Sequence, residues 1–305
     1  SFGGVPYDLR ISILPSLYGE TIVIRLLSGQ VDFIENNELG MLPLQEVVFR
    51  NCLARKSGMI LTAGPTGSGK TSTLYAALKM LNREGVSIIS VEDPVEYRLQ
   101  GVTQVQVNEK AGLTFEKGLR SIVRQDPDIV MIGEIRDRET AEIAVHAALT
   151  GHLVLSTIHT NQASDAPLRL MDMGIAPYLL SASLSLVIAQ RLAGRLCQHC
   201  KSPYILTEKE QQALGLPETC RGRRVYQKKG CENCHDGLKG RTGIFEMISI
   251  GRKERDLIHH GFSADRFREC MKRQGQPSMG EAALTLMAEG VITPEEASMI
   301  AAGED

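Results

Sequence analysis

The residues best suited to chemistry lie in a glycine-rich stretch that begins at Gly64. Gly64, Gly69, Lys70 and Thr71 satisfy G-x-x-x-x-G-K-[ST], the pattern of a phosphate-binding loop. Glycines let backbone N–H groups converge on a β-phosphate, the lysine can reach the β- and γ-oxygens, and the threonine hydroxyl can bind Mg²⁺. The stretch predicts a nucleoside triphosphate site made of Gly64, Pro65, Thr66, Gly67, Ser68, Gly69, Lys70, Thr71 and Ser72.

Carboxylates that follow two other apolar runs are the candidates for hydrolysis. The reaction needs one carboxylate near the attacking water and usually another near Mg²⁺. Glu134 follows the apolar run 129–132, and we expect it to organise Mg²⁺ directly or through water. A neighbouring run ends in Glu92, Asp93 and Glu96, and the residues alone leave open which of the three polarises the water.

Two histidines and two arginines are further candidates. His152 and His159 flank the apolar run 153–157, where a strand-end imidazole could sense the γ-phosphate or simply satisfy local hydrogen bonds. Arg10 and Arg25 occupy polar positions in otherwise apolar runs. A guanidinium supplied across a subunit boundary can stabilise charge on the γ-phosphate, but exposed strand arginines are usually only solvated.

Four of the seven cysteines form the pairs Cys197-x-x-Cys200 and Cys231-x-x-Cys234. Two such pairs suit tetrahedral Zn²⁺ with four thiolates, which is a closed structural site because no position remains for water. A nearby histidine could replace one ligand, and unligated cysteines are the alternative. Paired cysteines in a chain without a leader favour metal and a reducing compartment over disulfides.

Composition and charge limit the class of protein. At 305 residues, with 43% hydrophobic and 23% charged residues, the chain suits a soluble globular protein of two or three domains. A net charge of −2 gives no basic excess for nucleic acid or a membrane surface. The chain begins at Ser1 without an initiator Met or a signal segment, so we expect a fragment of a longer protein. The low-charge stretch 173–190 suits a buried helix better than a membrane span.

The elements that must position these residues follow from hydrophobic periodicity. Short apolar runs alternate with amphipathic patterns, which predicts an α/β fold with a mostly parallel sheet and helices on both faces. Ligands bind beyond the carboxyl ends of such strands, so the phosphate loop, Glu96, Glu134 and His159 are expected to share one edge. The expected strands are 59–63, 87–91, 104–107, 129–132 and 153–157, with a hairpin or two strands over 7–27. The expected helices are 43–55, one from 70, 115–124, 139–149 and one from 294.

Together these motifs resemble the secretion-superfamily ATPases, the motors of bacterial type II secretion and type IV pilus assembly. The resemblance covers essentially the whole chain, through G-P-T-G-S-G-K-T-S-T-L-Y, V-E-D-P-V-E-Y, R-Q-D-P-D-I-V-M-I-G-E-I-R-D, T-G-H-L-V-L-S-T-I-H-T-N and A-Q-R-L-A-G-R-L-C. It implies the end of a PAS-like α+β subdomain over 1–28, a linker over 29–40, a RecA-like P-loop NTPase core over 41–196, a zinc module over 197–241 and a C-terminal helical region over 242–305.

The resemblance also implies roles for single residues. Glu96 matches the catalytic carboxylate of an aspartate box, and Glu134 matches the Walker B glutamate. His152 and His159 match the two histidines of a histidine box. The tetracysteine element resembles the module of secretion and pilus-extension ATPases, which retraction ATPases lack.

At the level of the assembly, the resemblance implies a hexameric motor that uses ATP, Mg²⁺ and Zn²⁺, with Arg10 and Arg25 as arginine fingers for a neighbouring subunit. The implied partners are an inner-membrane platform protein and a cytoplasmic docking protein. They would hold the ATPase peripherally at the cytoplasmic face of the inner membrane, without nucleic acid. A nonhydrolysing nucleotide-binding scaffold and a nucleic-acid translocase are the alternatives, and the residues leave open whether the machine is a secretion system or a pilus.

Overall fold

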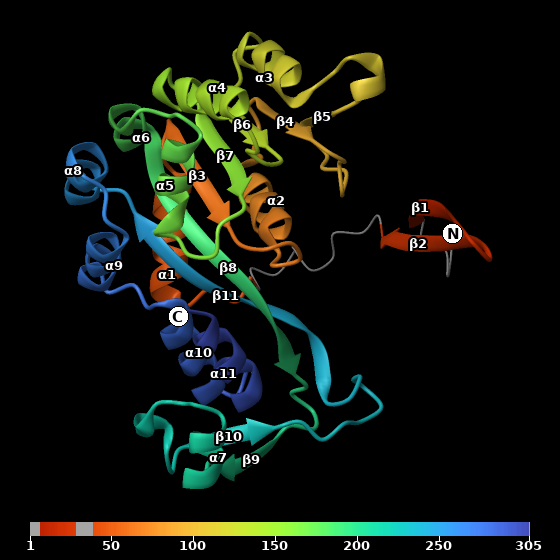
Figure 1. Ribbon diagram of the computed structural model, residues 1–305, viewed down its shortest axis with the longest axis vertical. Helices are drawn as coiled ribbons and strands as arrows, with labels where there is room; N and C mark the ends of the chain where they lie inside the picture. The colour runs from red at the N-terminus through yellow and green to blue at the C-terminus, as the bar shows by residue number, and fades with distance from the viewer. Residues whose placement is uncertain (1–6, 29–38, 305) are drawn as a thin grey trace.

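A seven-stranded sheet forms the centre of the computed structural model, which describes residues 7–28 and 39–304 (Figure 1). The strand order is β11-β8-β3-β7-β6-β4-β5. Neighbouring strands are parallel except β8 and β11, which pair antiparallel. The strands are β3 (Gly58–Ala63), β4 (Ile88–Glu92), β5 (Thr103–Gln106), β6 (Ile129–Ile132), β7 (Leu153–Ile158), β8 (Leu184–Leu196) and β11 (Leu238–Ser249). The predicted α/β P-loop class is confirmed.

Helices cover both faces of this sheet because its strands are apolar on both sides, as in a buried parallel sheet. Ile60 of β3 packs with Phe49 and Leu74 of α1 and α2 in one core cluster. Met59, the preceding residue, points to the other face and joins a cluster that includes Ala144 of α4. The helices up to β8 are α1 (Pro43–Leu53), α2 (Lys70–Leu81), α3 (Phe115–Val123), α4 (Arg138–Leu149), α5 (Asp165–Asp172) and α6 (Pro177–Ser183).

The expected helix across 173–190 is wrong beyond Ser183, where the chain enters β8. β8 pairs with β3 on one side and β11 on the other, so its apolar residues are buried on both faces. A short continuous apolar run does not distinguish a buried strand from a buried helix, and the pairing partners decide. Residues 242–249 lie in β11 for the same reason, although the sequence predicts that they begin the helical region.

β8 and β11 run past the sheet to a smaller cysteine-containing region, which is visible below the main sheet in Figure 1. That region holds β9 (Ser202–Ile205), α7 (Glu208–Ala213) and β10 (Arg224–Gln227), and β9 and β10 pair antiparallel. The chain then forms α8 (Arg252–His260), α9 (Ala264–Arg273), α10 (Met279–Ala288) and α11 (Pro294–Ala301).

A separate hairpin near the N-terminus joins β1 (Tyr7–Ser16) to β2 (Gly19–Ser28), as the alternating pattern predicted. Most of the expected linker lies outside the described residues, and the proposed domain boundaries remain a prediction. None of the described helices combines the length and apolar character that crossing a bilayer requires.

Candidate functional site

The glycine-rich loop joins the carboxyl end of β3 to the first turn of α2. Gly64 has φ +147° and Gly69 has φ +87°, which are conformations that L side chains rarely adopt. A Cβ on Gly64 would lie 2.5 Å from Ser68 Oγ and 2.7 Å from Gln190 O. The Ser68 hydroxyl is buried and has no hydrogen-bond partner among the described residues. A tight loop of backbone amides with an unused hydroxyl fits a bound phosphate.

Lys70 is held inside this loop. Its Nζ donates to Gly64 O at 2.7 Å and Pro65 O at 3.0 Å, and the residue is only 8% exposed. Burial lowers the pKa of Lys70, while the nearby charge of Glu134 opposes that shift. The ammonium therefore lies beside the carbonyls of the loop, within reach of a phosphate that the loop would cradle.

Glu134, at the end of β6, is the centre of a charged group. Arg136 donates to its Oε1 at 2.5 Å, and His159 Nε2 lies 3.3 Å from its Oε2. The hydrogen bond to Glu134 raises the pKa of the Arg136 guanidinium. Because β6 and β7 are parallel neighbours, Glu134 and His159 meet at one edge of the sheet, as expected.

The three rival carboxylates after β4 lie in different surroundings. Glu92 is 2% exposed, and its two oxygens accept hydrogen bonds from the Tyr75 and Ser90 hydroxyls. Asp93 is exposed and Glu96 is half-buried, and all three residues line the same cavity. No described side chain forms a hydrogen bond or ion pair with the Glu96 carboxylate. The same holds for the Asp93 carboxylate, so burial and hydrogen bonds set only Glu92 apart from the other two.

One cavity of about 440 Å³ unites these groups. The predicted residues that line it are Thr66, Gly67, Ser68, Gly69, Lys70, Thr71, Ser72, Glu92, Asp93, Glu96, Glu134 and His159. Leu192 of β8 and Arg241 of β11 also line it, and the sequence motifs did not predict either residue. The alternation of side chains along β8 could have predicted Leu192, because it places Gln190 and Leu192 on the same face of the strand, toward the loop. Gln190 Oε1 accepts a hydrogen bond from Thr73 of α2 at 2.7 Å.

Two further predicted residues, His152 and Arg10, do not line this cavity. His152 precedes β7, at the opposite end of that strand from His159, and its Nδ1 lies 3.0 Å from Ala147 O. Arg10 is exposed on the hairpin, opposite Arg25 in the strand register, and the side chain of Arg25 lies outside the described part of the chain. The implied roles of these three residues remain predictions.

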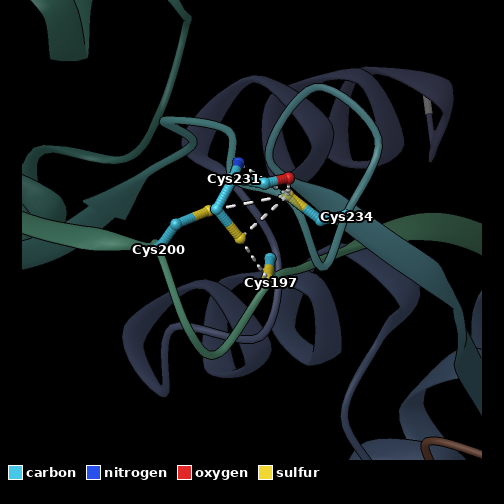
Figure 2. Close-up of side chains that lie close together, drawn as sticks. All are labelled: Cys197, Cys200, Cys231 and Cys234. Carbon is cyan, nitrogen blue, oxygen red and sulfur yellow. Dashed lines mark hydrogen bonds between the residues drawn. The ribbon is translucent and has the colours of Figure 1, made fainter.

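The four predicted zinc ligands converge in a second site (Figure 2). Their four sulfur atoms all lie within 4.8 Å of one another. Cys197 Sγ lies 3.9 Å from Cys231 Sγ, and Cys234 Sγ lies 3.7 Å from Cys200 Sγ and 3.6 Å from Cys231 Sγ. Four thiolates around Zn²⁺ at ~2.3 Å would stand about 3.8 Å apart, so the cluster fits a tetrahedral ion.

Comparison with known proteins agrees with the fold and the nucleotide-binding motifs. A family model described as Type II/IV secretion system protein matches residues 2–299. Type II secretion system protein E of Aeromonas hydrophila is 47% identical over 295 residues, which are 96% of this chain and 58% of that protein. Type IV pilus assembly ATPase PilB of Myxococcus xanthus is 46% identical over 299 residues, which are 96% of this chain and 52% of that protein.

A solved structure of the pilus retraction motor PilT with bound ADP is also similar. It is 27% identical with a TM-score of 0.69, and the match covers 95% of this chain and 72% of that one. The chain spans little more than half the length of the two curated relatives. Its sequence motifs, its fold and these matches together show that the chain belongs to the Type II/IV secretion system protein family.

Proposed function

We propose that this chain carries the ATP-hydrolysing site of a motor that works in type II secretion or type IV pilus assembly. The observation that carries the proposal is the single cavity in which the phosphate-binding loop faces Glu96, Glu134 and His159. The similarity to secretion and pilus-assembly ATPases, and to a motor solved with ADP, supports the same chemistry.

In this proposal each side chain has a separate task. Lys70 and the loop amides hold the β- and γ-phosphates, and Thr71 with Glu134 would hold Mg²⁺, which neutralises charge on those phosphates. Glu96 polarises the attacking water because its carboxylate faces the cavity without a competing partner among the described side chains. His159 keeps Glu134 oriented through the 3.3 Å contact.

The substitution Glu96→Gln tests the proposal because it keeps the side-chain shape and removes the proton acceptor. ATP affinity is expected to change less than about twofold, while kcat falls by more than about 100-fold. Glu84→Gln is the matched control, since Glu84 is exposed and outside the cavity. Both are measured in the full-length protein. Wild-type turnover by the Glu96 variant would overturn the assignment, and ATP binding without turnover in the wild-type protein would favour a nonhydrolysing scaffold.

The assembly is also part of the proposal. We infer a hexamer in which Arg10 and Arg25 complete the site of a neighbouring subunit, with Zn²⁺ on the four cysteines. An inner-membrane platform protein and a cytoplasmic docking protein would hold the ring at the cytoplasmic face of that membrane. The names of the relatives support both a secretion system and a pilus. Identifying the membrane protein captured by the full-length ATPase would distinguish the two machines.

A further inference from the structure

The buried carboxylate of Glu92 has no task in the proposed hydrolysis, yet donors from three elements surround it. Tyr75 of α2 donates to Oε2, Ser90 of β4 donates to Oε1 at 2.6 Å, and Gln104 Nε2 of β5 donates to Oε1 at 3.1 Å. Among the described residues no cation forms an ion pair with Glu92. A buried carboxylate is costly unless hydrogen bonds satisfy it, so this arrangement depends on its donors.

Two of those donors also hold the backbone that carries Glu96. Gln104 Nε2 donates to Tyr97 O at 2.9 Å, and Tyr97 N donates to the Tyr75 hydroxyl at 3.4 Å. On the other side of Glu96, the amide of the preceding residue donates to Gln106 Oε1 at 3.3 Å. Backbone groups of the residues before and after Glu96 are therefore held by side chains that do not themselves polarise water.

Tyr75 connects this loop to the phosphate-binding loop. It is fully buried, and its ring meets the Tyr97 ring edge-on, with centroids 5.7 Å apart at 85°. Burial and the hydrogen bond to Glu92 raise the pKa of Tyr75, so its hydroxyl stays protonated and remains a donor. The helix that carries Tyr75 begins at Lys70, so roughly 8 Å of helix separates the two residues.

We propose that Tyr75 and Glu92 are positioning residues that hold Glu96 in register with the phosphate-binding loop. The inference rests on the proposed function, in which Glu96 polarises water. The contacts that connect the phosphate-binding loop with the segment around Glu96 begin at Lys70 and follow α2 to the Tyr75 hydroxyl. From there hydrogen bonds lead to Glu92 and to the backbone of Tyr97. A shift of about 1 Å in such a group can lower a rate about 100-fold, so a few hydrogen bonds at this point have a large effect on turnover.

The test uses Tyr75→Phe in the full-length protein, because phenylalanine keeps the ring contact and removes only the hydroxyl. We expect kcat to fall at least ~10-fold while the Kd for ATP changes less than about twofold. Ser90→Ala is the matched control, since Ser90 donates to the same carboxylate without a hydrogen bond to the loop, and Gln104 still donates to the same oxygen in that variant. Its kcat should stay within about twofold of wild type. If Tyr75→Phe and Ser90→Ala have equal kcat values, the hydrogen bonds around Glu92 have only a structural role and the inference is wrong.

A double-mutant cycle shows whether Tyr75 acts through Glu96. In single-turnover measurements, Tyr75→Phe should slow the wild-type protein but add less than about a further twofold to Glu96→Gln. If Glu96→Gln alone has wild-type turnover, the proposed function of Glu96 fails. If Glu96→Gln is inactive and Tyr75→Phe has an equal effect in both backgrounds, or none, only the positioning role fails.

A second variant keeps the inference testable if Tyr75→Phe does not fold. Gln104→Met preserves side-chain length and removes the amide that bonds both Glu92 and Tyr97 O. The same selective loss of kcat is expected. A folded Gln104 variant with wild-type kcat would contradict the proposal.

Discussion

Glu92 and Glu96 lie four positions apart, and their surroundings give them different chemistry. Both residues line the cavity, but the first is buried and accepts hydrogen bonds from three donors, whereas the carboxylate of the second has no partner among the described side chains. In the proposed function, one glutamate is therefore a hydrogen-bonded anchor and the other is a proton acceptor. The surroundings of Gly64 likewise decide which residue type can stand there, because its positive φ and the atoms close to its Cβ position exclude a side chain.

We predict that Gly64→Ala weakens both nucleotide binding and folding. The new Cβ would collide with Ser68 Oγ and Gln190 O, so we expect a stability loss of more than about 2 kcal/mol and at least a ~10-fold weaker ATP affinity. Gly85→Ala is the control, since Gly85 also has a positive φ but nothing lies within 4 Å of its Cβ position. Denaturant unfolding and ATP titration measure the two quantities. Equal losses in the two variants would contradict the steric argument.

Among the elements, the long pair β8 and β11 connects the two sites. Leu192 and Arg241 of this pair line the nucleotide cavity, and farther along the pair the chain enters the cysteine cluster. β8 ends at Leu196 and Cys197 follows directly. A metal there would join the two ends of the region 197–234, and metal binding adds to the stability of the folded state.

We predict that Cys197→Ser removes bound zinc. Metal analysis of the wild-type protein should give about one Zn²⁺ per chain, and the variant should hold less than about a tenth of that. Cys220→Ala is the control, because Cys220 is buried in the same region but does not belong to the cluster. A chelator should likewise lower the unfolding temperature of the wild-type protein. A folded wild-type protein without metal would refute the zinc site.

At the scale of the whole molecule, the proposal of a site shared between subunits depends on the position of Arg10. It lies on the N-terminal hairpin, outside the cavity of its own chain, as a group supplied to a neighbouring subunit would. If sites form between subunits, turnover should rise with protein concentration, and the loop and the arginine need not come from the same chain.

Mixing two inactive variants tests this arrangement. Arg10→Ala and Glu96→Gln should each lose most turnover, and an equal mixture that exchanges subunits should recover about one quarter of the wild-type sites. The recovered sites combine an intact Glu96 from one chain with an intact Arg10 from another. A mixture that remains as inactive as its components would count against a shared site, provided native mass spectrometry shows mixed rings.

The sequence by itself determined the phosphate-binding loop, the carboxylates after the strands, the cysteine pairs and most strands and helices. These signals are local, because they depend on residue types at fixed spacing and on periodicity within one element. The sequence left open the choice among Glu92, Asp93 and Glu96, and it wrongly extended a helix into β8. Only the tertiary structure decided the extent of β8 and set the buried, hydrogen-bonded Glu92 apart from Asp93 and Glu96, because strand pairing, burial and the hydrogen bond from Tyr75 depend on residues that are distant along the chain.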